Sequence, residues 1–161
     1  APEFNRVTQE AVAQWIRDLG DQPGYDRTLR SIFVGHLHVT GADLGRGLNA
    51  GVEPAGLVID AAALPTGFDY VALGDIHKPQ CLLGTTHIRY SGSLDRMDFG
   101  EADETKQVVL VEIGASGRVG EPRAIPITST QFVTFAIENP ATARETMAAQ
   151  GETPSEARSP V

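Results

Sequence analysis

Short apolar runs that end at a glycine or a polar side chain recur along this chain. The run at residues 70–73 carries no charge and begins with an aromatic residue followed by a β-branched one. A run of this length and composition is typical of a buried strand, and residues 31–34 have the same character. The whole pattern predicts strands at residues 31–34, 57–59, 70–73, 88–90, 107–113 and 132–137.

Helical spacing is confined to two stretches. Between residues 8 and 19, apolar side chains recur every three or four positions and would share one face packed on the core: Ala11, Val12, Trp15, Ile16 and Leu19. Pro140 suits the first turn of a second helix that runs to Gln150. Residues 114–117 read as a hairpin turn, after which residues 118–127 return. Together these elements predict an α/β fold.

Candidate ligands follow two of the predicted strands. Gly35 is followed by His36, and Gly74 by Asp75 and His77. Gly74 would let the chain turn out of the sheet, and the carboxyl ends of strands are where α/β sheets place ligands. Imidazole and carboxylate groups suit Mn²⁺, Fe²⁺ or Zn²⁺. An isolated Asp-x-His is more often a loop without a task, but a second predicted strand that is followed by Gly and a candidate ligand, at Gly35-His36, favours a metal site.

The remaining histidines receive other interpretations. His38 is interpreted as a loop residue, and His87 as a surface or packing residue. The charged stretch from Asp95 to Lys106 is predicted to be exposed, and Lys78 to be solvated.

Composition narrows the possible classes of protein. The 161 residues suffice for one domain with a core. A net charge of -8 argues against a basic, non-specific nucleic-acid binder but not against a metal-dependent enzyme. The single cysteine, Cys81, allows no intramolecular disulfide; it is predicted to be a small apolar filler in a reducing cytoplasm. No apolar run has the length of a membrane span.

Three stretches resemble the SbcD family, the nuclease component of the SbcC–SbcD DNA-repair complex. They are residues 33–37 with Gly41-Ala42 downstream, residues 68–78, and residues 89–93 with their continuation to Lys106. Their order and spacing also match, and the resemblance spans roughly residues 8–140. The third stretch is the most diagnostic, because calcineurin-like phosphoesterases outside this family do not usually carry it.

The resemblance implies a calcineurin-like metallophosphoesterase sandwich and a two-metal, usually manganese-dependent phosphodiesterase that cuts DNA beside an SbcC-type ATPase. By position, His36 resembles the ligand of the family's single-His motif, and His77 the second His of its Gly-His-x-His motif. Asp75 stands where the first His of that motif is usual. Aspartate is a competent, harder ligand, so a changed metal preference is expected.

The family's first-half motifs, Asp-x-His, Gly-Asp and Asn-His, do not precede the helix predicted at residue 8. The chain therefore resembles a partial catalytic domain: its second half at residues 1–127, the start of a capping region at 128–150, and a disordered tail at 151–161. We expect the chain alone to bind metal weakly and to cut DNA poorly or not at all, because the first-half metal motifs are missing from it. A homodimer is compatible with the sequence.

A nucleic-acid contact is the final candidate. Ser91, Ser93 and Arg96 follow a predicted strand near the metal site, where they would reach a phosphate backbone. An ST-turn with a surface Arg fits the same residues equally well. For the whole chain, the alternatives are an inactive remnant that keeps a DNA- or SbcC-facing surface, and another calcineurin-like phosphodiesterase.

Overall fold

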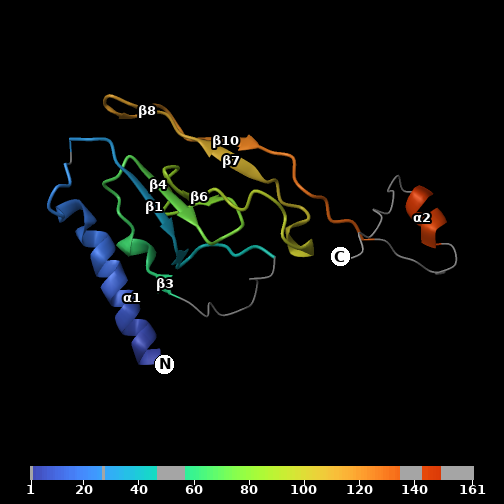
Figure 1. The fold of residues 1–161 in the computed structure, drawn as a ribbon, viewed down its shortest axis with the longest axis horizontal. Helices are drawn as coiled ribbons and strands as arrows, with labels where there is room; N and C mark the ends of the chain where they lie inside the picture. The colour runs from blue at the N-terminus through green and yellow to red at the C-terminus, as the bar shows by residue number, and fades with distance from the viewer. Residues whose placement is uncertain (1, 27, 47–56, 135–142, 150–161) are drawn as a thin grey trace, which may run out of the picture.

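A mostly parallel sheet forms the centre of the protein. The computed structural model describes residues 2–26, 28–46, 57–134 and 143–149. Three parallel strands, β1 (Ile32–His36), β4 (Tyr70–Gly74) and β6 (Ile88–Tyr90), lie side by side, and β5 (Gln80–Cys81) pairs antiparallel with β6. Helix α1 (Pro2–Arg17) lies along one side of this sheet (Figure 1). This arrangement confirms the predicted α/β class.

Smaller elements surround the sheet. A ribbon of β7 and β10 lies on the side of the sheet away from α1 (Figure 1). The smaller elements are the strands β2 (His38–Val39), β3 (Val58–Ile59), β7 (Gln107–Leu110), β8 (Ile113–Gly114), β9 (Gly117–Arg118) and β10 (Arg123–Pro126), the 3₁₀ turns η1 (Asp18–Asp21), η2 (Ala61–Ala63) and η3 (Phe99–Glu101), and the helix α2 (Ala143–Ala149). Strands β2 and β3 pair in parallel, whereas β7 with β10 and β8 with β9 pair antiparallel.

Helix α1 differs from its prediction at its start and in its buried face. It begins at Pro2 instead of residue 8, which suits proline's tolerance of a helix's first turn. Ala13 and Ile16 are buried against the core, whereas Trp15 is 58% exposed. Successive residues on a helix point about 100° apart, so burying Ile16 turns Trp15 toward solvent. The prediction that Trp15 packs in the core was wrong.

Strand β1 is an edge strand with one covered face, not the buried strand that was predicted. Phe33 is buried, but Ile32 and Val34 are 51% and 77% exposed. Strand β4 lies between β1 and β6 and is buried as predicted, with Val71 fully covered. The two strands have equally apolar sequences, and their position in the sheet decides their burial.

The core lies between α1 and the sheet face that carries Phe33, Val71 and Ile88. These three residues are in register across β1, β4 and β6. Leu73 and Tyr90 follow one pleat later on the same face. The buried core residues are Ala13, Ile16, Phe33, Val39, Ile59, Ala63, Leu64, Val71, Leu73, Ile76, Leu82, Ile88 and Tyr90.

Three further predictions need correction. The run at 107–113 is divided into β7 and β8, which are separated by residues 111–112. Residues 132–134 form no strand, and residues 135–137 lie outside the described part. Cys81 is exposed on β5 and is not an apolar filler.

The predicted hairpin at 114–117 is confirmed by the pairing of β8 with β9. A second helix is present as α2 (Ala143–Ala149). Its predicted start at Pro140 and the predicted disordered tail lie outside the described residues. In the described part of the chain, no helix is long and apolar enough to cross a membrane.

Candidate functional site

The carboxyl ends of β1 and β4 meet, which brings two predicted ligands together. His36 is the last residue of β1 and is in register with Gly74, the last residue of β4. A Cβ atom on Gly74 would lie 2.9 Å from His36 Nδ1, so glycine leaves room for the imidazole beside it. The prediction that Gly74 makes the turn out of the sheet was wrong. The residue with the positive φ, of 102°, is Asp75.

Asp75 lies between two histidines. Its Oδ1 is 3.7 Å from His36 Nε2, and its Oδ2 is 3.2 Å from His38 Nδ1. The His36 side chain is 82% exposed, whereas that of His38 is 19% exposed. A positive φ costs a non-glycine residue on the order of 1–3 kcal/mol, and such strain concentrates at functional sites. The carboxylate is thus held at this edge against a backbone cost.

Sequence reasoning missed the contact made by His38. It was interpreted as a loop residue, yet its ring approaches Asp75 more closely than that of His36 does. The contact could have been predicted from the sequence, because His38 lies two residues after His36 and alternate residues in extended backbone point to the same side.

Tyr90 anchors the segment that carries both histidines. Its hydroxyl donates to Leu37 O at 2.6 Å and accepts from Val39 N at 3.1 Å. The side chain is fully buried. Burial, helped by the negative charge of Asp75, outweighs the bond from Val39 N–H and raises the pKa of Tyr90 to about 12.

Replacing Tyr90 with phenylalanine is expected to lower the free energy of unfolding by about 1–3 kcal/mol, because Val39 N–H and Leu37 C=O lose a buried partner. The raised pKa adds a pH signature. The wild type should keep this contribution below about pH 10, the pKa of an unfolded tyrosine, and lose it as the pH rises toward 12. Urea unfolding across this range measures both effects. A Tyr25→Phe control, which removes only a bond to Ser31 Oγ, should cost less; equal losses would contradict the anchoring role.

The imidazole of His77 contacts Glu101 and not Asp75. Its Nδ1 lies 2.8 Å from Glu101 Oε1, and its side chain is 36% exposed. Among the described residues, no group of three or more His, Cys, Asp or Glu side chains is placed to hold a metal ion. The predicted ligands His36, Asp75 and His77 are therefore divided between two clusters, one around each carboxylate.

The prediction that residues 95–106 are exposed was wrong for Glu101 and Lys106, although other residues of the stretch, such as Phe99 and Asp103, are exposed. Lys106 and Glu101 are only 1% and 2% exposed. Lys106 Nζ donates to Glu101 Oε2 at 2.7 Å and to Glu104 Oε2 at 2.9 Å. The turn η3 brings Glu101 inward, and Asp98 caps that turn by accepting from Gly100 N at 2.6 Å.

Hydrogen bonds keep this buried cluster ionised. Burial raises the pKa of Glu101, but the bonds from Lys106, His77 and Met97 N together outweigh it and hold the pKa below its ordinary value. Burial likewise lowers the pKa of Lys106, and the bonds to Glu101 and Glu104 reverse this and raise it. The pair is therefore a charged ion pair inside the protein.

The Ser-Gly-Ser segment packs on the backbone of His77. Ser93 N donates to His77 O at 3.0 Å, and Gly92 adopts a φ of +85°. A Cβ on Gly92 would lie 2.6 Å from His77 O and 2.7 Å from Pro79 Cγ. This most diagnostic stretch of the sequence thus has a steric role beside a predicted ligand.

A Gly92→Ala substitution is expected to destabilise the protein by at least about 2 kcal/mol, through backbone strain and a clash with a carbonyl that has no freedom to move away. Thermal unfolding measures the loss. Gly84→Ala is the matched control, since Gly84 also has a positive φ of +66° but open space around its Cβ. If the two variants lose equal stability, packing against His77 contributes nothing.

The predicted phosphate-binding residues make internal hydrogen bonds. Arg96 donates from Nε and Nη2 to Glu104 O and from Nη1 to Thr130 O. Ser93 Oγ donates to Asp95 O at 2.7 Å, and Ser91 Oγ to Gly92 O at 3.3 Å. These bonds give the three residues structural contacts, but not those of the alternative: both serine hydroxyls donate to carbonyls, whereas the oxygen of an ST-turn accepts from a backbone N–H, and Arg96 is half-buried. The phosphate contact stays a prediction.

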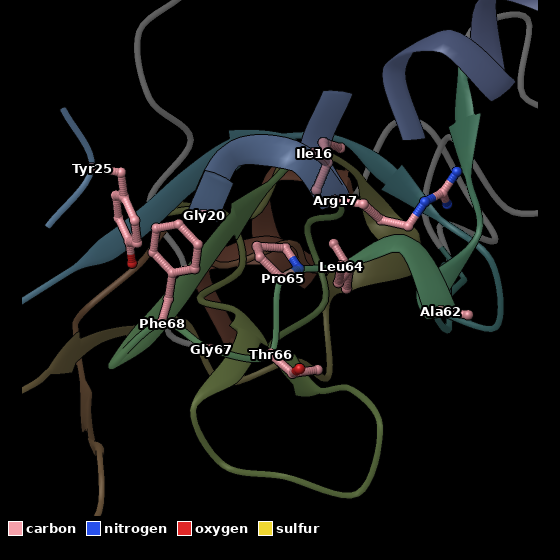
Figure 2. A pocket seen from close by; sticks show the side chains of 10 residues that line it. All are labelled: Ile16, Arg17, Gly20, Tyr25, Ala62, Leu64, Pro65, Thr66, Gly67 and Phe68. Carbon is pink, nitrogen blue, oxygen red and sulfur yellow. The ribbon is translucent and has the colours of Figure 1, made fainter. Parts of the chain in front are cut away.

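A cavity of about 390 Å³ lies at the opposite end of the sheet (Figure 2). Phe68, just before β4, and Tyr25 place their rings side by side there, with centroids 5.6 Å apart. Arg17 is the charged residue of the lining, which contains no histidine or carboxylate. Among the described residues, the cavity lining therefore lacks the imidazole and carboxylate groups that the proposed kind of metal site uses.

Comparison with known proteins shows which proteins this chain is similar to. No protein-family model matches the chain. It is 35% identical over 126 residues, 76% of its length, to the SbcD component of the SbcCD nuclease of Escherichia coli strain K12. The chain is homologous to part of SbcD. SbcD of Bacillus subtilis strain 168 is also 35% identical, over 85 residues. The match spans 29% of E. coli SbcD and 21% of B. subtilis SbcD, so the similarity concerns a minor portion of each relative.

The imidazole and carboxylate groups that follow β1 and β4 are of the type that binds a hard divalent cation, but among the described residues they are too few to complete the ligand set of one. Imidazole and carboxylate groups are ligands that Mn²⁺ accepts. Within the ranges that the structure describes, however, they form no cluster of three. These residues therefore fit part of the ligand set of a divalent-cation site and not all of it.

Proposed function

We propose that this chain is part of a metal-dependent DNA nuclease, to which it contributes His36, Asp75 and His77 as manganese ligands. The observation that carries the proposal is the in-register ending of β1 and β4, which brings His36 and Asp75 to one edge of the sheet in a chain homologous to SbcD. In this proposal the remaining ligands come from the part of the nuclease that corresponds to the unmatched portion of SbcD. The fold this requires is a partial metallophosphoesterase sandwich.

The metal ions, when bound, would supply an activated hydroxide and stabilise the charge on the phosphate. Other residues of the chain hold and orient the proposed ligands. Tyr90 fixes the segment that carries His36, and the Ser-Gly-Ser turn supports the backbone of His77. Asp75 brings a harder ligand and one more negative charge than the usual histidine, which favours Mn²⁺ over softer ions. Ser91, Ser93 and Arg96 are proposed to contact the DNA backbone.

The proposed division of the chain places the catalytic part at residues 1–127 and the start of a capping region at 128–150. Ile127 N donates to Lys106 O at 2.9 Å, which ties the end of the first part to the buried lysine. As partners we propose DNA and an SbcC-type ATPase, in the cytoplasm, with a second copy of the chain as a further possible partner.

A second candidate is an inactive chain that keeps only a DNA- or SbcC-facing surface. The absence of a three-donor cluster among the described residues favours it. Another calcineurin-like phosphodiesterase is less well supported, because the Ser-Gly-Ser stretch belongs to the resemblance with SbcD.

A chimera separates these candidates. The matched segment of E. coli SbcD is replaced by the corresponding part of this chain, and cleavage of linear DNA is measured with Mn²⁺. We expect cleavage, and its loss in a chimera that carries His77→Ala. A folded chimera that binds DNA without cutting it would contradict the nuclease proposal and support the inactive alternative.

A further inference from the structure

Glu101 is a buried carboxylate surrounded by hydrogen-bond donors. Its Oε2 accepts from Lys106 Nζ at 2.7 Å and from Met97 N at 3.0 Å. Its Oε1 lies 2.8 Å from Nδ1 of His77. With 3% of the side chain exposed, the carboxylate is held in one orientation by these contacts.

This arrangement determines where the hydrogen of the His77 ring lies. A carboxylate paired with an ammonium group is ionised and only accepts hydrogen bonds, so Nδ1 of His77 must donate. In a neutral imidazole the other nitrogen, Nε2, then carries the free lone pair. Metal-binding histidines are commonly oriented in this way by a carboxylate behind them.

The backbone of His77 is anchored by the same part of the chain. His77 O accepts from Ser93 N at 3.0 Å, and Lys106 Nζ lies 3.5 Å from the same oxygen. Ring and carbonyl are therefore both held by residues 93–106, a stretch that includes the loop predicted to be exposed at residues 95–106.

We propose that Glu101 is a positioning residue for His77: it accepts the Nδ1 hydrogen and thereby presents Nε2, unprotonated, to a divalent cation. Lys106 holds Glu101 in the orientation that this requires. The choice of tautomer stands on geometry alone, whereas the cation rests on the proposed function.

The sharpest test is the tautomer of His77, read from its ring nitrogen chemical shifts by NMR in the chain without metal. The wild type should carry its hydrogen on Nδ1. In Glu101→Gln, Lys106 and Met97 N attract the amide oxygen, which leaves the NH₂ group facing His77. Nδ1 must then accept, and the hydrogen should move to Nε2. A wild-type ring protonated on Nε2 would overturn the proposal without any variant.

Glu104→Gln is the matched control. It also removes a carboxylate partner of Lys106, but Glu104 does not contact His77. The control should keep the wild-type tautomer. A purely structural role for Glu101 would instead change both variants equally, or leave the tautomer unchanged in both, and either result contradicts positioning.

Titration with Mn²⁺ separates this proposal from the proposed function. Paramagnetic broadening of the His77 signals should need about 10- to 100-fold more Mn²⁺ in Glu101→Gln than in wild type or Glu104→Gln. Equal broadening in all three would overturn the positioning role and leave the metal ligand in place. No broadening in wild type would overturn the proposed function, and the cation half of this proposal with it.

Discussion

Replacing Lys106 with methionine is expected to lower the free energy of unfolding by about 3–5 kcal/mol, the typical cost of removing one partner from a buried ion pair. The lysine side chain is fully buried and forms ion pairs with both Glu101 and Glu104. Methionine fills similar space but leaves those carboxylates facing each other without a cation. Chemical denaturation of the chain measures the difference.

The chain's other lysine provides the control. Lys78 pairs with Asp43, but both side chains are substantially exposed, at 39% and 60%. Lys78→Met should therefore cost about 0–1 kcal/mol. The double variant Glu101→Gln with Lys106→Met should recover part of the loss, since it leaves fewer unpaired charges buried. Equal costs for the two lysine substitutions would contradict the buried ion pair.

The same pair gives the stability a pH window. Because the pKa of Glu101 is held below its ordinary 4.5, its contribution is complete above that pH and is lost as the pH falls through the folded value. Because the pKa of Lys106 is held above 10.5, its contribution is complete below that pH and is lost as the pH rises through the folded value. Unfolding curves of Lys106→Met should lose the part of the alkaline dependence that Lys106 contributes and keep the part that comes from Tyr90; an unchanged alkaline slope would contradict the assignment to Lys106.

Replacing His77 with alanine is expected to remove measurable Mn²⁺ affinity from the chain. The imidazole is a proposed ligand, and alanine offers no donor in its place. Loss of an oriented ligand should weaken binding by more than the 10- to 100-fold expected for loss of the residue behind it. Calorimetric titration with Mn²⁺ measures the change, with far-ultraviolet circular dichroism to show that the fold is kept.

His87→Ala is the matched control for this experiment. His87 precedes β6 and so lies at the amino end of a parallel strand, opposite to the edge that carries His36. Its Nδ1 is 2.5 Å from Thr85 Oγ1, and burial lowers its pKa. This substitution should leave Mn²⁺ binding unchanged. If wild type and His77→Ala bind equally well, His77 is not a ligand.

Local pattern predicted the elements that lie inside the sheet. Strands β4 and β6 were found because each lies between two other strands and buries apolar side chains, Val71 and Leu73 on β4 and Ile88 and Tyr90 on β6. The burial of Ile32 and of Trp15 was predicted wrongly. Whether each of these two side chains is buried depends on which neighbouring element covers its face. A local sequence pattern does not contain that information.

The site was predictable in part for the same reason. Placing ligands after parallel strands correctly brought His36 near Asp75, because parallel register aligns strand ends. The partner of His77 was missed, since Glu101 lies in a stretch whose composition resembles a solvated loop. Only the turn η3 and the lysine five residues later make its burial possible.

The central claim is that His36, Asp75 and His77 bind the same kind of cation, and Mn²⁺-induced broadening of NMR signals tests it most directly. Substoichiometric Mn²⁺ is added to the wild-type chain, and the loss of signal is followed residue by residue. We predict that His36, Asp75 and His77 broaden first, while His87 at the far end of the sheet persists. Broadening of His87 at the same Mn²⁺ concentration, or none at the three proposed ligands, would contradict the account.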